Sequence, residues 1–208
     1  MLIEETLQGF LDEVASDSPA PGGGSASALS GAMGAALGAM VCRLTIGKKG
    51  YESVKEEMSK HVNELDDLKK ALTLLIDMDT DAFNKLMNAF KLAKTTDDEK
   101  ANRSRAIQEA TKEAVKVPME TCHKCLKVAE ILVPIAEKGN TNSITDVGCA
   151  ALMARTGLEG AAMNVRINLG SLKDEAFKGK VSSELSHMET MMAEATKKAL
   201  DIVNAKLK

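Results

Sequence analysis

One aspartate interrupts the apolar side of a segment that the sequence predicts to be a long helix. Apolar residues recur at spacings of three and four from Val54 to Leu75, and the next position in that series is Asp79. A buried carboxylate is costly unless it is paired or hydrogen-bonded. Burial raises the pKa of a carboxyl group, which suits it to proton transfer near neutral pH. Asp79 is therefore either an acid–base catalyst or a structural residue bonded to a neighbouring helix end or arginine. Asp77 and Asp81, two residues away, are expected to turn towards solvent.

A second candidate is the glycine-rich run Pro19–Ser25, of sequence PAPGGGS. Glycines allow a sharp turn with exposed N–H groups, and Ser25 is expected to cap the helix that follows. Free N–H groups at a helix start favour an anion. The run is not a Walker A loop or a dinucleotide fingerprint, because no Gly-Lys-Ser/Thr follows it and no strand precedes it. Gly22, Gly23, Gly24 and Ser25 therefore form either an anion or ligand site, or a tight turn with a cap.

Five further polar residues fall in or beside segments that are otherwise built from small side chains. Lys48 and Lys49 lie in a glycine-flanked turn, where they either grip a carboxylate or are ordinary solvated lysines. Asp146 and Asn164 are eighteen residues apart and share a helix face with Asn168 nearby, but about 27 Å of helix separates the first two. They cannot both touch one small group within one chain, and a capping role is the alternative for Asp146.

The cysteines and histidines do not form a convincing metal or redox motif. The run Cys122–Cys125 has the CxxC spacing, but no second Cys/His pair completes a zinc site, and the βαβ context of a thioredoxin-like motif is missing. We expect these to be ordinary helix residues, and we expect His61 and His187 to be solvated. No metal is predicted. Cys42 and Cys149 complete a set of four cysteines that we expect to be reduced.

The remaining pattern is helical from end to end, with no segment that predicts a strand. The break at residues 94–99 carries a cap at Thr95 or Thr96. Pro118 and Pro134 each either kink a helix or begin a new one. Further breaks are expected at residues 139–143 and 178–179. The predicted helices are residues 2–16, 26–45, 51–94, 96–116, 118–131, 144–169 and 181–206. The sequence thus predicts an all-α, single-domain bundle of long helices over residues 1–208, with two central Ala/Gly-rich helices.

Composition limits the classes of partner. The formal net charge is −3 with both signs interspersed, and there is no Trp, one Tyr and four Phe, so we expect no nucleic acid partner. Residues 22–42 are uncharged and long enough to cross a bilayer, but Gly and Ala dominate them, and we expect a buried helix and no membrane. Four acidic residues in the first thirteen exclude a secretory signal, which favours a cytoplasmic protein.

With these residues in view, the chain resembles the cyclodeaminase/cyclohydrolase family, which includes bacterial methenyltetrahydrofolate cyclohydrolases and the cyclodeaminase half of formiminotransferase-cyclodeaminase. The resemblance spans nearly the whole chain, in order. The matching stretches are Pro19–Ser25, Gly31–Leu37, Met40–Cys42, Leu44–Lys49, Asp79 with Ala82-Phe83, Val117-Pro118, Glu137–Asn140, Asp146, and Ala161–Asn168.

The resemblance implies an all-α bundle, usually a homodimer, that acts on a one-carbon unit bridging N5 and N10 of tetrahydrofolate. The family's proposed catalytic aspartate matches Asp79, and the glycine-rich loop belongs to its folate crevice. Lys48 or Lys49 is expected to meet the glutamate tail. Asn140, Asp146, Asn164 and Asn168 are expected to contact substrate, with Asp146 and Asn164 acting at different ends of their helix or across a dimer. Each of these expected roles is assigned because the residue lies in one of the matching stretches.

The resemblance leaves three functions to compare. The first is a cyclohydrolase that converts 5,10-methenyltetrahydrofolate to 10-formyltetrahydrofolate, with Asp79 as general acid and base and no cofactor besides the folate substrate. The stand-alone length and the strings around Cys42 and Lys48 favour it. The second is a formiminotetrahydrofolate cyclodeaminase that releases ammonia, and the third is a non-catalytic folate-binding bundle.

Overall fold

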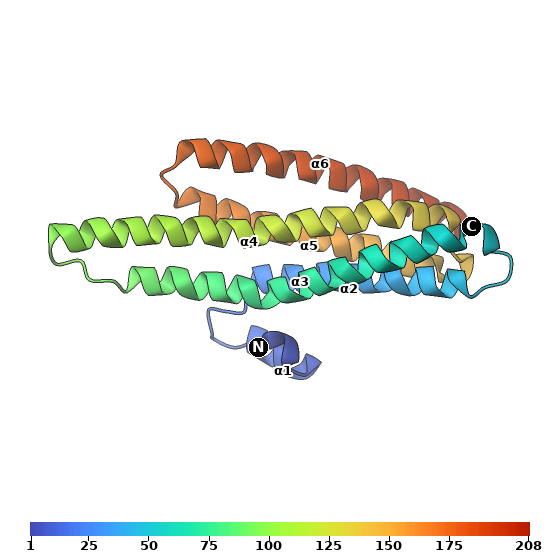
Figure 1. Cartoon of the computed structure of the whole chain (residues 1–208), viewed down its shortest axis with the longest axis horizontal. Coiled ribbons are helices and arrows are strands. Elements are labelled where there is room, and N and C mark those ends of the chain that lie inside the picture. Colours follow the sequence, from blue (N-terminus) through green and yellow to red (C-terminus); the bar gives the residue numbers. More distant parts are fainter.

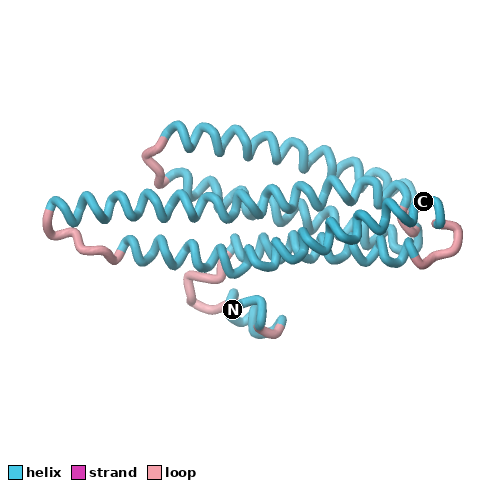
Figure 2. Tube along the Cα trace, viewed as in Figure 1, coloured by secondary structure: helices cyan, strands magenta, loops and turns pink.

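The structure, a computed structural model, describes all 208 residues and is helical throughout, with loops only at the turns between helices (Figure 2). This confirms the predicted all-α class. The α-helices are α1 (Leu7–Val14), α2 (Gly23–Ile46), α3 (Lys55–Phe90), α4 (Asp97–Lys138), α5 (Ile144–Gly170) and α6 (Glu175–Lys206). Short 3₁₀ turns occupy Leu2–Glu4, Glu52–Val54 and Thr141–Ser143.

The five long helices, α2 to α6, run side by side along the length of the molecule (Figure 1). Helix α2 packs against α3, α5 and α4, while α4 also packs against α3, α5 and α6. Helix α6 covers α4 and α5 and leaves the outer side of α2 open. The hairpin of α3 and α4 projects beyond the others at one end, and α1 lies apart on one side (Figure 1).

Helices α2 and α5 approach each other so closely that glycine is needed at the contact. A Cβ on Gly34 would stand 2.9 Å from the carbonyl oxygen of Ala150 on α5. A Cβ on Gly157 would stand 2.7 Å from the sulfur of Cys125, which fills the space where α4 meets the pair. Small residues at this seam allow backbone to pack on backbone, as the two Ala/Gly-rich segments predicted.

The start of α2 differs from the prediction. The helix begins at Gly23 with Gly22 as its N-cap residue, so Ser25 lies inside the first turn and is not the cap. Ser25 is fully buried, and its hydroxyl donates a 2.7 Å hydrogen bond to the carbonyl oxygen of Ile76 on α3. The serine ties α2 to α3 instead of closing its own helix end.

Helix α4 is continuous, which settles the question that its prolines left open. It runs through Pro118 and Pro134 without a break, and begins with a capping box formed by Thr96 and Glu99 as predicted. A proline removes the N–H that would bond to the carbonyl four residues earlier. For Pro118 that carbonyl belongs to Ala114, and a side chain from α5 bonds to it instead.

The bounds of three predicted helices were wrong. The long third helix spans Lys55–Phe90, shorter than residues 51–94, because a 3₁₀ turn precedes it and the chain turns after Phe90. The predicted break at residues 178–179 lies inside α6, which begins at Glu175 because the carboxylate of Asp174 accepts the N–H of Phe177. The predicted helix 2–16 is divided into a 3₁₀ turn and α1.

The N-terminal segment covers a residue that was expected to face solvent. The backbone N–H of Leu2 donates a 2.6 Å hydrogen bond to Oδ1 of Asp77, and Oδ2 of that carboxylate is buried without a partner. Asp81 is exposed as predicted. His61 was also expected to be solvated, but only 13% of its side chain is exposed, between Glu57 and Glu64.

Helix α2 is long and apolar enough to cross a membrane by length and composition, and it is the only helix in the chain that is. Half of its apolar window is buried inside the bundle, and the core helix of a soluble protein gives the same signal. Its small residues face α3 and α5, as close helix packing requires.

We predict that Gly34→Ala destabilises the fold, because the added methyl meets the backbone of α5, which cannot rotate away. Overpacking costs about 1–3 kcal/mol, of which about 1 kcal/mol returns as helix propensity. Gly179→Ala is the matched control: nothing lies within 4 Å of its Cβ, and it should gain about 0.5–1 kcal/mol. Urea unfolding of both variants measures the difference, and equal stability of Gly34→Ala and wild type would contradict the packing argument.

Candidate active site

A cavity of about 340 Å³ lies where the start of α2 meets the middle of α3 and the end of α5. Its size falls in the range of small-molecule sites, about 300–1,000 Å³. It gathers Gly22, Gly23, Gly24, Asp79, Asn164 and Asn168, which the sequence had marked as candidates. The other lining residues are Pro19, Ala20, Ala82, Phe83, Leu86, Met87, Ala114, Ile167 and Ser171.

Asp79 is the only charged residue among those that line the cavity. Its carboxylate lies directly against the α-carbon of Gly24, and a Cβ at that position would overlap the carboxylate atoms. Glycine is therefore required there by the approach of α3 to the first turn of α2. The sequence marked Gly24 in the glycine-rich run and Asp79 in the apolar series separately, and the structure shows that the two residues contact each other.

Two opposing effects act on the ionisation of Asp79. Burial raises the pKa of the carboxyl group above its usual range, and hydrogen bonding from the backbone and side chain of Ser25 partly offsets this rise. The first turn of α2 also favours the ionised form, since its N–H groups carry the positive end of the helix dipole. A raised pKa brings this carboxyl group closer to neutrality, where it can both accept and donate a proton.

Ser25 supports the carboxylate from behind the cavity. Its hydroxyl lies 3.4 Å from Oδ2 of Asp79 and 3.3 Å from the hydroxyl of Thr80, besides its shorter bond to Ile76. Ser25 is fully buried and does not line the cavity. Its contacts fix the position of α3 along α2, and they therefore fix the position of Asp79.

Two asparagines of α5 face the cavity one helical turn apart. Nδ2 of Asn164 donates to the carbonyl of Gly160 at 3.0 Å, and Nδ2 of Asn168 donates to the carbonyl of Ala114 at 2.9 Å. The second bond supplies the donor that Pro118 took away from α4. No hydrogen bond within the chain uses either Oδ1, so both carbonyl oxygens are left for a ligand.

Sequence reasoning missed most of the apolar wall. Phe83 and Leu86 follow Asp79 by four and seven residues, so they share its face of α3 and could have been found from that spacing. Ile167 and Ser171 of the opposite wall carry no such signal. Ile167 is 74% exposed, which shows that the cavity opens towards the uncovered side of α5.

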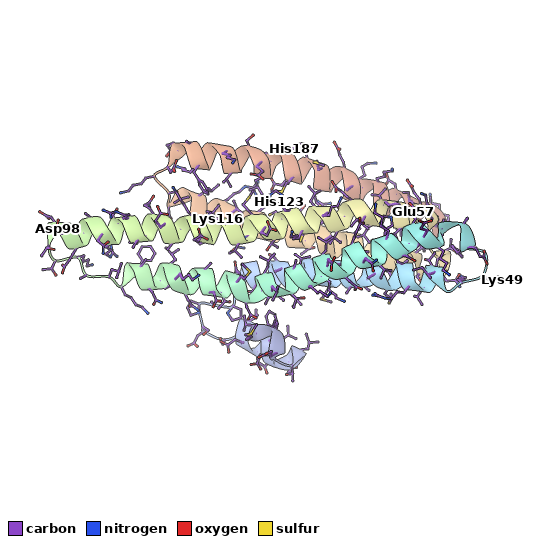
Figure 3. The ribbon with its side chains drawn as sticks, in the orientation of Figure 1. Lys49, Glu57, Asp98, Lys116, His123 and His187 are labelled. Atoms are coloured by element: carbon purple, nitrogen blue, oxygen red, sulfur yellow. The ribbon has the colours of Figure 1, made fainter.

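The remaining four candidates lie at the other end of the bundle. Nζ of Lys48 donates to Oδ1 of Asn140 at 2.6 Å, and Asp146 lies in the first turn of α5 beside them. The whole length of α2, about 35 Å, separates them from the cavity. Figure 3 shows Lys49 at the end of the molecule opposite the α3–α4 hairpin. Within one chain, Lys48, Lys49, Asn140 and Asp146 are not part of this site.

The cysteines lie in the packing and not in a site. Cys42, Cys122 and Cys125 are buried and unpaired, and Cys149 is exposed. Burial raises the pKa of Cys42 and of Cys122 to about 12, which keeps both thiols protonated. Nε2 of His123 lies 3.0 Å from Oε1 of Glu184 on α6. No group of three or more His, Cys, Asp or Glu side chains is placed to hold a metal ion.

Comparison with known proteins finds relatives that match nearly the whole chain. The chain is 47% identical over 191 residues to the methenyltetrahydrofolate cyclohydrolase of Methylorubrum extorquens, which covers 92% of this chain and 90% of that protein. It is 35% identical to the formimidoyltransferase-cyclodeaminase of Mus musculus over 90% of this chain, but it spans only 35% of that longer protein.

A solved structure has the same fold. The crystal structure of formiminotetrahydrofolate cyclodeaminase from Thermotoga maritima matches all of this chain and all of its own, with a TM-score of 0.90 and 32% sequence identity. The family profile described as Formiminotransferase-cyclodeaminase matches residues 6–187. The chain therefore belongs to the formiminotransferase-cyclodeaminase family.

Proposed function

We propose that the protein is a methenyltetrahydrofolate cyclohydrolase, which reversibly hydrolyses 5,10-methenyltetrahydrofolate to 10-formyltetrahydrofolate. One observation carries the proposal: a single carboxylate, Asp79, stands in a cavity that has no other charged lining residue. The methenyl bridge is a delocalised amidinium cation, so one unpaired carboxylate both attracts it and stands beside the carbon that reacts. The 47% identity to the Methylorubrum cyclohydrolase over most of both chains supports this substrate.

The chemistry needs one group that takes a proton and then returns it. Ionised Asp79 removes a proton from water as the oxygen adds to the bridging carbon, which gives a neutral carbinolamine. Asp79 then donates that proton to N5. The C–N5 bond breaks, the hydroxyl becomes the formyl carbonyl, and its proton leaves to solvent. One proton is released overall, which balances the loss of the substrate's positive charge.

The surrounding residues position the substrate. The free carbonyl oxygens of Asn164 and Asn168 accept hydrogen bonds from ring N–H groups of the folate, while Phe83 and Leu86 cover its rings. The N–H groups at the start of α2 face the carboxylate and favour its ionised form, which attracts the cationic substrate. No metal or cofactor is proposed, and the unpaired buried thiols suit a cytoplasmic protein.

The protein is proposed to act as a homodimer through one long apolar surface, without a nucleic acid or membrane partner. This surface, the α2/α5 face, is the side of α2 and α5 that no other helix covers. It is about 22 Å long, from Leu152 to Ile167 on α5, and two helices wide. Its exposed and half-buried apolar side chains are Met33, Leu37, Met40 and Leu44 of α2, and Leu152, Met153, Met163 and Ile167 of α5.

A second copy on this face completes the site. A twofold axis across the middle of α2 sets the two α2 helices head to tail. The Lys48 end of each copy then lies beside the Gly23 end of the other, where the cavity opens through Ile167. In this arrangement Lys48, Lys49, Asn140 and Asp146 serve the cavity of the second copy. This accounts for four candidate residues that one chain keeps about 35 Å away.

We predict that Asp79→Asn lowers kcat by about 10²–10⁴-fold, the usual contribution of a general acid–base residue. Its stability at pH 7 should equal or exceed that of the wild type. Burial raises the folded-state pKa of Asp79, so ionisation costs stability as the pH rises through that value, and the neutral amide avoids this cost. Loss of the methenyl chromophore measures kcat, and thermal unfolding measures stability; an unchanged kcat would refute the assignment.

Measuring turnover of two folate substrates distinguishes a cyclohydrolase from a cyclodeaminase. Wild-type protein is incubated with 5,10-methenyl- and with formiminotetrahydrofolate. Faster hydrolysis of the first supports the proposal, and ammonia release from the second alone would identify a cyclodeaminase. Binding of the methenyl substrate without turnover of either would leave a folate-binding bundle.

We predict that Met163→Lys converts the dimer to a monomer and removes most activity. Met163 is 67% exposed on the α2/α5 face, at the end of α5 that lies against the start of α2, where a charge would be buried at the interface. Leu74→Lys is the control, because Leu74 is 53% exposed on the outer side of α3. Sedimentation equilibrium should give twice the 22.1 kDa chain mass for the wild type and the control. A dimeric Met163→Lys protein would place the interface elsewhere.

A mixing experiment tests whether the site is shared between copies. Asp79→Asn and the double variant Lys48→Ala/Lys49→Ala should each be nearly inactive. Each mixed dimer then has one intact site of two, and half of all dimers are mixed. Co-expression should therefore restore about a quarter of wild-type activity. No recovery above the two separate variants would contradict a composite site.

A further inference from the structure

Two hydroxyl groups lie beside the carboxylate of Asp79 but outside the cavity. The hydroxyl of Ser25 lies 2.7 Å from the carbonyl oxygen of Ile76 and 3.4 Å from Oδ2 of Asp79. The hydroxyl of Thr80 lies 3.3 Å from that of Ser25. Ser25 is fully buried, Thr80 is half-buried, and neither residue lines the cavity. We call Thr80 and Ser25 the hydroxyl pair.

The supply of hydrogens decides which member of the hydroxyl pair donates to the other. A serine hydroxyl has one hydrogen and two lone pairs. The short bond to Ile76 uses the one hydrogen of Ser25, so that hydrogen is not available to Thr80. The contact between the two hydroxyls therefore consists of the hydrogen of Thr80 and a lone pair of Ser25. Thr80 is the donor, and Ser25 both accepts and donates.

The contacts of Thr80 differ from those of other threonines in the helices. A threonine hydroxyl inside a helix often bonds to the carbonyl four residues earlier, and Thr73 on the same helix does so to Lys69 at 2.8 Å. For Thr80 the corresponding carbonyl belongs to Ile76, which accepts the hydroxyl of Ser25. Because that acceptor is occupied, the hydroxyl of Thr80 is directed at Ser25.

Ser25 has two acceptors within reach of its one hydrogen. The carbonyl of Ile76 lies inside α3, where the helix supplies it with another donor, so it is not left unpaired if Ser25 turns away. An ionised carboxylate is a stronger acceptor than a carbonyl oxygen. The charge on Asp79 therefore decides which of the two acceptors Ser25 prefers.

We propose that Thr80 is a positioning residue for the reaction, acting through Ser25 on the ionised form of Asp79. This inference rests on the proposed function, in which Asp79 is ionised before it takes a proton from water. Ser25 turns its hydrogen from Ile76 to Oδ2 when Asp79 is ionised, and turns back when the carboxyl group is protonated. Thr80 donates to Ser25 in both states. A hydroxyl that accepts a hydrogen bond becomes a stronger donor, so Thr80 strengthens the bond that reaches the carboxylate.

No other ionisable group lines the cavity beside Asp79. The side chains that α2, α4 and α5 contribute to the wall are uncharged, and so is the glycine-rich loop. On α3 the nearest acids are Asp77, which is bonded to the N-terminal segment, and Asp81, which is exposed. Burial raises the pKa of Asp79 and the hydrogen bonds from Ser25 lower it. The ionisation of Asp79 should therefore respond to a change in the hydroxyl pair.

The first test compares the pH dependence of kcat/KM, whose acidic limb reports ionisation of the free enzyme's general base. Thr80→Val keeps the branched side chain but loses the donor, which makes ionised Asp79 less stable and moves the limb to higher pH. The shift should be about 0.2–0.6 pH unit, the loss of cooperative strengthening. Ser25→Ala removes the whole bond and should shift the limb by about 1–2 pH units.

Two further variants separate the donor from the side chain that carries it. Thr80→Ser keeps the hydroxyl and should follow the wild-type profile. Thr73→Val is the matched control, because it removes a threonine hydroxyl from the same helix that bonds to Lys69 and not to Ser25. A uniform fall in kcat/KM of Thr80→Val with an unmoved acidic limb would show a merely structural role and overturn the inference.

A direct titration without substrate distinguishes this inference from the proposed function. NMR follows protein labelled with carbon-13 at the aspartate carboxyl carbons, and the resonance missing from Asp79→Asn identifies Asp79. The titration midpoint should rise from wild type and Thr80→Ser to Thr80→Val, and again to Ser25→Ala. Equal midpoints in wild type and Thr80→Val would also overturn the inference. The expected order of midpoints in a protein that turns over neither folate would support the hydroxyl pair and reject the proposed function instead.

Discussion

The structure depends on the contact between the backbones of α2 and α5. Two helices meet this closely only when neither has a side chain at the seam, and Gly34 against Ala150 and Gly157 against Ser27 meet that condition. Because the seam holds no large side chains, the larger apolar residues of both helices are left on the outer side. The same contact sets the start of α2 between α3 and α5. The close packing of α2 on α5 therefore produces both the cavity and the α2/α5 face.

The sequence predicted features that follow from local patterns. The apolar stripe of α3 and its interruption at Asp79, the texture of α2 and α5, and the Thr96 capping box all depend on residues within a few turns of one another. Ser25 shows the limit of such reasoning. It has the usual properties of an N-cap, but its hydroxyl bonds to Ile76, fifty-one residues away. Nothing near Ser25 in the chain indicates that partner.

For the candidate site residues, too, local patterns identified single residues but not their partners in the fold. Gly24 and Asp79 could be marked separately by their types, but only the packing of α2 on α3 shows that each requires the other. Asn168 was marked as a polar residue in a small-residue segment, and the family resemblance added a contact with substrate. Neither reveals that it replaces the hydrogen bond lost at Pro118. Lys48 was placed with the folate by the same resemblance. The length of α2 then separates it from the cavity within one chain, because a resemblance gives residues and not the copy that supplies them.

The bond between Asn168 and Ala114 has a consequence for how this family can diverge. A proline inside a long helix leaves a carbonyl that needs a donor, and here the donor is a residue that also borders the catalytic cavity. Loss of the asparagine alone leaves that carbonyl without a donor, so residue 168 is constrained for as long as residue 118 is proline. Substitutions that change substrate preference are therefore better tolerated in the apolar wall, at Phe83 or Ile167. The side chains there make no hydrogen bond to a backbone carbonyl that lacks its helical donor.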